Sequence, residues 1–195
     1  MNKQNDRKNQ KKGGSTMKMI LFDLEATCEH DGSIEHEVIE IGAVKVNETG
    51  EILDTFTTFV KPDENPVLTD FCKNLTSIQQ SDVDSAPTFQ EAIQSFQEWI
   101  GDEAYGLGSW GFYDKKQLQK QLSECNMDTD WLNPHTSLKH AYAEFNHLKR
   151  PCGVQKALKR EGMTFEGTAH RGIDDAKNIA RIYAKYPDEF MKTLK

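Results

Sequence analysis

Two carboxylates spaced two residues apart could do chemistry early in this chain. Asp23 and Glu25 lie within an apolar run, residues 19–27, which the pattern predicts to be a buried strand. Side chains alternate between the two faces of a strand, so this spacing directs both carboxylates to one face. Neighbouring carboxylates repel one another, and their burial is costly unless a cation neutralises them. The sequence therefore predicts a cation site on this strand.

Three residues from later parts of the chain could complete that site. Asp114 follows a second predicted strand, residues 105–111, while His170 and Asp175 bracket the start of an amphipathic helix. Carboxylate oxygens are the ligands that magnesium and manganese prefer, which leaves the imidazole free for proton transfer. An ordinary imidazole has a pKa of about 6.5 and can accept a proton near neutral pH. We therefore expect a divalent metal centre with a general base beside it.

The remaining pattern indicates which elements position these residues. Apolar runs bounded by turn residues predict two further strands, residues 38–46 and 52–60. A capping box at residues 88–91 opens a helix that ends near Gly101. The pattern predicts later helices at residues 115–125, 137–145, 154–161 and 172–186. Three early strands followed by a helix, a strand and several helices are typical of an α/β layer fold.

Length and charge limit the domain organisation and the partners. The 195 residues suit one domain with a sizeable core, which we place at residues 17–195. Residues 1–16 carry five Lys or Arg against one Asp, so we expect a disordered basic tail. We interpret it as a solvated tail, with an arm that touches nucleic acid as the alternative. The net charge of −7 argues against wide wrapping of duplex DNA.

The composition also bears on the compartment. No apolar stretch approaches the roughly 20 residues that span a bilayer, and the polar N-terminus lacks the apolar region of a secretory signal. The four cysteines show neither a disulfide framework nor the spacing of zinc ligands, so we expect reduced thiols. These features predict a cytoplasmic protein without a membrane partner.

Three segments that contain the acidic residues resemble the three exonuclease motifs of the DEDDh family. They are Phe-Asp-Leu-Glu-Ala-Thr at residues 22–27, Ser-Trp-Gly-Phe-Tyr-Asp at residues 109–114, and His-Arg-Gly-Ile-Asp-Asp-Ala-Lys-Asn at residues 170–178. Residues 71–80 also resemble the nucleotide-contacting segment of the Eri-type branch, which includes KapD-like bacterial proteins. The resemblance runs from about residue 17 to residue 186. It implies a ribonuclease H-like three-layer fold, with a central mixed β-sheet flanked by helices.

The resemblance also implies a set of roles for the five residues. Asp23, Glu25 and Asp175 would hold one of two Mg²⁺ (or Mn²⁺) ions, and Asp114, through water, would help Glu25 to hold the other. His170 would be the general base, because it lies five residues before Asp175, as in DEDDh enzymes. The tyrosine subgroup places its tyrosine four residues before that aspartate, whereas this chain has an arginine there. Nucleoside 5′-monophosphates would be the products.

Substrate contacts follow from the same resemblance. The terminal 3′ nucleotide would be bound by Glu25, Ala26, Leu75, Thr76, Ile78 and His170. Ordinary core packing is the alternative for Leu75 and Ile78. Trp110 is expected in the core, whereas Phe112 and Tyr113 could either stack on bases or anchor the strand-helix corner. Asp114 could instead serve only as a helix N-cap.

The leading hypothesis is a metal-dependent 3′→5′ exonuclease that acts on the 3′ ends of single-stranded nucleic acid, RNA rather than DNA. A DNA-proofreading type of exonuclease is the alternative within the enzymes. A noncatalytic or weakly catalytic regulator of the KapD-like kind is the alternative from another class. A pure binding module has no need of all five chemical residues, and all five are present. The sequence therefore favours the enzyme.

Overall fold

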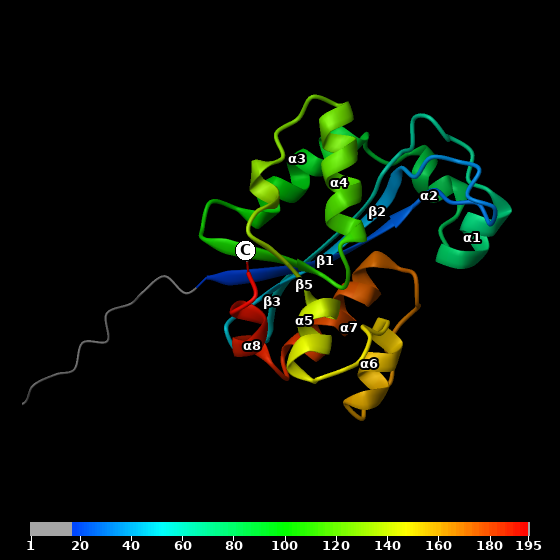
Figure 1. The fold of residues 1–195 in the computed structure, drawn as a ribbon. Helices are drawn as coiled ribbons and strands as arrows, with labels where there is room; N and C mark the ends of the chain where they lie inside the picture. The colour runs from blue at the N-terminus through cyan, green and yellow to red at the C-terminus, as the bar shows by residue number, and fades with distance from the viewer. Residues whose placement is uncertain (1–16, 195) are drawn as a thin grey trace, which may run out of the picture.

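A mixed five-stranded sheet forms the centre of the computed structural model, which describes residues 17–194 (Figure 1). The strand order is β3-β2-β1-β4-β5. β1 pairs with β2 and β2 with β3 in antiparallel register, whereas β1–β4 and β4–β5 are parallel. The strands are β1 (Lys18–Ala26), β2 (Val38–Val46), β3 (Ile52–Phe59), β4 (Tyr105–Ser109) and β5 (His135–Ser137).

Helices cover both faces of this sheet. α3 and α4 lie on one face, and α5, α6, α7 and α8 lie on the other, which makes three layers (Figure 1). α1 and α2 follow β3 and pack near the end of β1. The bounds are α1 (Asp70–Thr76), α2 (Gln80–Asp84), α3 (Phe89–Ile100), α4 (Tyr113–Glu124), α5 (Leu138–Phe145), α6 (Val154–Arg160), α7 (Gly172–Tyr183) and α8 (Pro187–Met191).

The alternation of side chains along β1 decides where its carboxylates point. Ile20, Phe22 and Leu24 pack against α3 and α4 on one face of the sheet. Met19 and Leu21 face the other way and pack beneath α5 and α7. Because side chains of a strand alternate with a period of two, Asp23 and Glu25 share the face of Met19 and Leu21. The two acidic residues therefore lie on the side of the sheet that α7 covers.

Two glycines allow α7 to lie directly on β2. A Cβ atom added to Gly42 would lie 2.0 Å from the carbonyl carbon of Gly172 and 2.0 Å from the nitrogen of Ile173. No residue with a side chain can occupy that position without displacing the helix. This close approach sets the start of α7 against the middle of the sheet, next to Asp23.

Most predicted elements are confirmed, with corrections at their ends. The predicted strand 105–111 stops at Ser109, because the Ser109 hydroxyl donates to the carbonyl of Gly111 and turns the chain. The predicted helix 172–186 ends at Tyr183, and Pro187 begins α8 instead. The short elements α1, α2 and β5 were not predicted. The expected tail at residues 1–16 lies outside the described residues, and the domain bounds stay a prediction.

Two smaller expectations concern cysteines and membranes. The four cysteines are free thiols, as predicted. Within residues 17–194, no helix is both long enough and apolar enough to cross a membrane.

Candidate active site

Three carboxylates from opposite ends of the chain meet above β1. Asp23 and Glu25 project from the strand, and Asp175 projects from the first turn of α7. One carboxylate oxygen of each lies within 4.8 Å of the others. Three hard oxygen donors at this separation match the donors that a small divalent cation takes. The structure thus brings together the three residues that were expected to share an ion.

Asp114 reaches the same site from the opposite layer. β1 and β4 are parallel, so their carboxyl ends meet at one edge of the sheet, and the chain passes from β4 directly into α4. The Asp114 carboxylate is buried and accepts a hydrogen bond from the backbone N–H of Leu24 at 3.3 Å. Asp114 lies inside the first turn of α4, and Phe112 is the N-cap residue. The capping alternative is therefore wrong.

His170 lies at the rim of this site in an unusual backbone conformation. Its φ is +60°, the left-handed region, which costs a residue with a side chain about 1–2 kcal/mol. Its backbone N–H donates to Asp175 Oδ2 at 2.8 Å. Asp174 accepts the N–H of Thr168 at 2.8 Å and so orders the preceding loop. These bonds hold an exposed imidazole beside the Asp175 carboxylate.

These residues line an open cleft of about 700 Å³. Its acidic wall contains the four carboxylates together with His170. Lys139 of α5 and Lys156 of α6 also line the cleft. A cleft lined by both cation ligands and ammonium groups suits a substrate that carries phosphates.

Burial and mutual repulsion keep protons on these carboxylates. Burial raises the pKa of Glu25 to about 8, and the charges of Asp175, Glu40 and Asp114 add to this effect. Burial, together with Asp114 and Glu25, also raises the pKa of Asp23 well above its ordinary value. Burial raises the pKa of Asp114 to about 6. Such a group of acids becomes fully ionised at neutral pH only when a cation compensates the charge. The donor set therefore fits divalent metal ions.

A buried ion pair next to the cleft was missed by the sequence analysis. Glu40 is fully buried on β2 and accepts from Arg171 at 3.1 Å (Nε to Oε2) and at 3.3 Å (Nη2 to Oε1). Glu40 Oε2 also accepts the N–H of Gly172 at 3.1 Å, and the guanidinium lies 5.2 Å from the ring centre of Phe59. The feature of the sequence that indicates this pair is Glu40 itself, a single glutamate inside the apolar run 38–46. The pair fixes the chain between His170 and Asp175.

The expected nucleotide-contacting segment lies beside the end of β1. The Cys72 thiol contacts the carbonyl of Ala26 at 3.6 Å, which places α1 next to that residue. Leu75 is 38% exposed, but Ile78 is fully buried with Cys72 in a small core cluster. The Thr76 hydroxyl is also buried, and it donates to the carbonyl of Cys72 at 2.9 Å. In this segment, therefore, Leu75 is exposed, whereas Thr76 and Ile78, which were also expected to contact the nucleotide, are buried.

The aromatic residues after β4 divide between core and surface. Trp110 is buried, as predicted, and its indole N–H donates to the carbonyl of Cys152 at 2.9 Å. Phe112 is 47% exposed and stacks on His140 with ring centres 4.8 Å apart. Tyr113 is 45% exposed and lines the cleft. Both exposed rings are accessible to a ligand.

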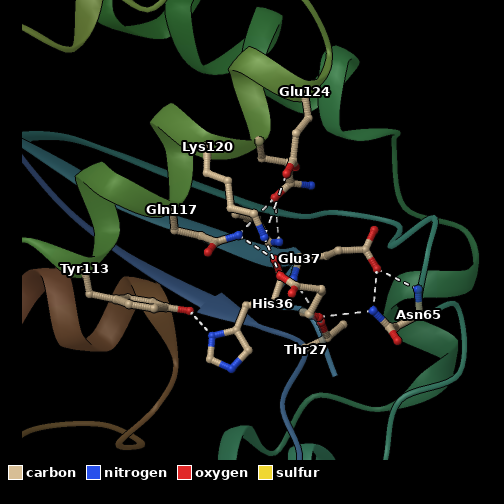
Figure 2. Close-up of polar contacts among 11 residues, drawn as sticks. Thr27, His36, Glu37, Asn65, Tyr113, Gln117, Lys120 and Glu124 are labelled. Atoms are coloured by element: carbon tan, nitrogen blue, oxygen red, sulfur yellow. Dashed lines mark hydrogen bonds and ion pairs between the residues drawn. The ribbon is translucent and has the colours of Figure 1, made fainter. Parts of the chain in front are cut away.

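The loop between β1 and β2 is tied to α4, and this contact holds Tyr113. Figure 2 shows the Tyr113 hydroxyl pointing at His36 from α4, with 2.7 Å between the hydroxyl and Nδ1. The Gln117 side chain donates to the carbonyl of His36 at 2.6 Å. Nearby, the buried Glu37 carboxylate accepts the backbone N–H and the side-chain amide of Asn65 at 2.6 and 3.2 Å. These contacts therefore tie the loop between β1 and β2 to α4 beside Tyr113, which lines the cleft.

The chain is similar to named proteins with this arrangement. The sequence model of a family described as exonuclease matches residues 20–183. The "3'-5' exoribonuclease 1" proteins of Homo sapiens and Rattus norvegicus are 35% and 34% identical over 180 residues, which cover 84% of this chain. These residues cover 50% and 51% of the two relatives, so the chain spans about half of their length.

A solved structure agrees with these sequence matches. The nuclease domain of 3'hExo, a DEDDh family member, bound to rAMP, has a TM-score of 0.84 and 31% sequence identity. The match covers 92% of this chain and 96% of that domain. The fold is thus ribonuclease H-like, as predicted. The chain belongs to the exonuclease family, and within it to the DEDDh group of metal-dependent nucleases.

Proposed function

We propose that the chain is a 3′→5′ exonuclease that removes nucleotides from the 3′ ends of single-stranded RNA and depends on two Mg²⁺ (or Mn²⁺) ions. The convergence of Asp23, Glu25 and Asp175 within 4.8 Å carries this proposal. Asp114 and His170 line the same cleft. Four carboxylates and one imidazole are the complete set that the sequence analysis assigned to this chemistry.

The similar proteins support the substrate class. The rat and human relatives are named exoribonucleases, and the similar nuclease domain was solved with a bound ribonucleotide, rAMP. Lys139 and Lys156, which line the same cleft as the carboxylates, suit the phosphates of such a substrate.

The metal ligands in this proposal follow the geometry of the carboxylates. Asp23, Glu25 and Asp175 would hold one ion, and Asp114 would help Glu25 to hold the second. When bound, divalent ions supply polarisation of the scissile phosphate and of a water molecule. The protein itself holds the four carboxylates close together. Asp23 and Glu25 come from β1, Asp114 comes from α4 and Asp175 comes from α7.

His170 is the proposed general base. Its imidazole is exposed to solvent in the cleft and accepts the proton of the attacking water. The hydrogen bond from its backbone N–H to the Asp175 carboxylate holds the base next to the metal ligands. The product is a nucleoside 5′-monophosphate, and the shortened strand ends again in a 3′ hydroxyl. Leu75, which is exposed on α1 near the end of β1, offers an apolar surface for the last base.

One experiment tests this function directly. Purified protein is incubated with RNA and DNA of identical sequence, labelled at the 5′ end, with magnesium, with manganese and with chelator. We expect a ladder that shortens one nucleotide at a time from the 3′ end, faster on RNA, and no shortening with chelator. Asp23→Asn should abolish shortening, whereas Asp84→Asn, at an exposed position on α2, should not. Dominant internal cuts, or full activity in chelator, would overturn the proposal.

The same experiment addresses the alternatives. Faster shortening of DNA would favour the proofreading type of exonuclease. A protein that binds RNA without shortening it under any metal would favour the noncatalytic regulator. The raised pKa values of Glu25 and Asp114 argue against that regulator, because a binding module gains nothing from burying repelling carboxylates.

A further inference from the structure

A basic groove lies directly beside the catalytic cleft. It is a cavity of about 440 Å³ between the end of α5 and α6. Its basic lining residues are His147, Lys149, Arg150, Lys156 and Arg160, and none of its lining residues is acidic. We propose that this groove, hereafter the basic groove, binds the phosphates of the RNA strand upstream of the 3′ end. This inference rests on the proposed function, because it assumes that the 3′ end occupies the cleft.

The groove and the cleft are continuous. Lys156 lines both of them. Trp110, which lines the cleft, donates its indole N–H to the carbonyl of Cys152, which lines the groove. Gly153 and Val154, the next residues along the chain, line the cleft again. A strand that leaves the metal ligands past Lys156 therefore enters the basic groove.

The geometry of the chain turns these cations toward one another. α5 ends at Phe145, and His147 adopts a left-handed φ of +52° that reverses the chain. The N–H of Leu148 closes this turn on the carbonyl of Ala143 at 2.8 Å. The turn places Lys149 and Arg150 beside α6. Lys156 and Arg160 are four residues apart on α6, so they share one face of the helix.

The charges of the groove are uncompensated by the protein. Lys149, Arg150, Lys156 and Arg160 are exposed. Among residues 17–194, none of these four forms an ion pair with a carboxylate within 4.0 Å. The nearby carboxylate of Glu161 is engaged by the hydroxyls of Tyr142 and Tyr186. Like charges at this spacing repel, and a polyanion relieves the repulsion.

This cluster of cations stands out because the chain as a whole is acidic. The net charge is −7, so the average surface repels nucleic acid. A local track of cations that leads out of the cleft selects one path for the backbone of a strand. Phosphate contacts of this kind position a strand and do not read its bases. The groove therefore fits a substrate of any sequence, provided that it extends beyond the last few nucleotides.

The test compares two double variants of the full chain. In the groove variant, Lys149→Ala is combined with Arg150→Ala. In the matched control, Lys61→Ala is combined with Lys116→Ala, which removes the same charge at exposed positions away from the groove. Affinity for single-stranded RNA is measured by fluorescence anisotropy in chelator across a range of salt concentrations. Cleavage of a dinucleotide and of a long RNA is measured with magnesium.

Counterion release sets the expected size of the effect. Each phosphate contact on a single strand contributes about 0.7 to the slope of log affinity against log salt, so the groove variant should lose about 1.4. If the two proteins bind equally well at 1 M salt, where these contacts are screened, the groove variant should bind about 25-fold more weakly than the unmodified protein at 0.1 M salt, for two lost contacts. The control should keep the slope of the unmodified protein. Cleavage of the dinucleotide should be unchanged in both variants, because it does not reach the groove.

The outcomes separate this inference from the proposed function. If the unmodified protein cleaves the dinucleotide and the two variants have equal slopes, the groove is not a strand-binding site and the proposed activity stands. If no protein cleaves either substrate but the groove variant alone loses slope, the activity is wrong and the groove stands. If the groove variant loses slope and cleaves only the long RNA more slowly, the result supports both the groove as a strand-binding site and the proposed activity.

Discussion

Arg171 and Glu40 form a two-point ion pair, with Nε 3.1 Å from Oε2 and Nη2 3.3 Å from Oε1. The two residues are 131 positions apart in the sequence. The pair joins β2 to the residue between His170 and α7, so it lies immediately behind the proposed base and the Asp175 ligand. Glu40 is fully buried, whereas the Arg171 side chain is 28% exposed.

Replacing Arg171 alone should lower the free energy of unfolding more than replacing both Arg171 and Glu40. Arg171→Met leaves the Glu40 carboxylate buried without its partner, and we expect a loss of about 2–3 kcal/mol, below the range for fully buried pairs because solvent reaches Arg171. Adding Glu40→Gln to Arg171→Met should recover part of that stability, since no buried charge remains. Urea unfolding of the two single variants and the double variant gives the coupling energy. Additive losses would show that the pair is not coupled.

Removal of His170 should separate base catalysis from metal binding. His170→Ala should lower single-turnover cleavage by about 10²–10⁴-fold, the usual contribution of a general base, with metal affinity near normal. His170→Asn should behave in the same way but keep the stability of the unmodified protein, because Asn tolerates a left-handed backbone. Near-normal cleavage by either variant would remove His170 from the mechanism.

The metal-free protein should become less stable as the pH rises. The pKa of Glu25 is raised from 4.5 to about 8 and that of Asp114 from 3.8 to about 6, so the folded protein binds these protons more tightly than the unfolded chain does. Their stabilising contribution is complete below about pH 4 and is lost as the pH rises through about 6 and about 8. In chelator, the melting temperature should therefore fall over this window, and magnesium should restore it.

A single substitution can check the origin of that pH dependence. Glu25→Gln removes the group with the pKa of about 8, so it should flatten the upper part of the fall in melting temperature. Glu48→Gln, at an exposed turn between β2 and β3, serves as the matched control and should leave the fall unchanged. Identical profiles for Glu25→Gln and the unmodified protein would show that another group titrates.

Gly42→Ala should displace α7. The new Cβ would lie 2.0 Å from backbone atoms of Gly172 and Ile173, and backbone cannot move aside as a flexible side chain can. We expect a loss of about 3 kcal/mol, at the upper end for overpacked sites, together with weaker metal binding because Asp175 moves with the helix. Gly153→Ala, whose Cβ would meet nothing within 4 Å, is the stability control. Thermal unfolding and metal titration measure the two effects.

The periodic parts of this fold were predictable from the sequence. The predicted strand 38–46 matches β2 in full, because its apolar run is bounded by turn residues. The three-residue strand β5 carries too little periodicity to be recognised, and its formation depends on pairing with β4. The five candidate site residues line one cleft. Strand parity predicted that Asp23 and Glu25 share a face, whereas the roles of the other three residues came from the resemblance of their motifs.

The remaining parts depend on contacts that no local pattern reveals. Glu40 is an isolated charge in an apolar strand, and its partner Arg171 lies in another motif. Ile78 and Leu75 are both apolar and close in sequence, yet Ile78 is fully buried and Leu75 is exposed, because Ile78 packs in a core cluster with Ile39 and Cys72. The basic groove likewise forms only when the turn at His147 brings Lys149 beside Arg160. Tertiary packing decides these cases.

The alternation of side chains along β1 limits which misfolded forms of this protein can be stable. Phe22 and Leu24 occupy the core on one face, while Asp23 and Glu25 occupy the cleft on the other. A slip of one residue in the pairing of β1 would exchange the two sets, which would bury the carboxylates beneath α3 and α4. Such a molecule could not complete its core. Misregistered chains should therefore fail to fold instead of accumulating as intact but inactive protein, so every stably folded copy presents its acidic residues correctly.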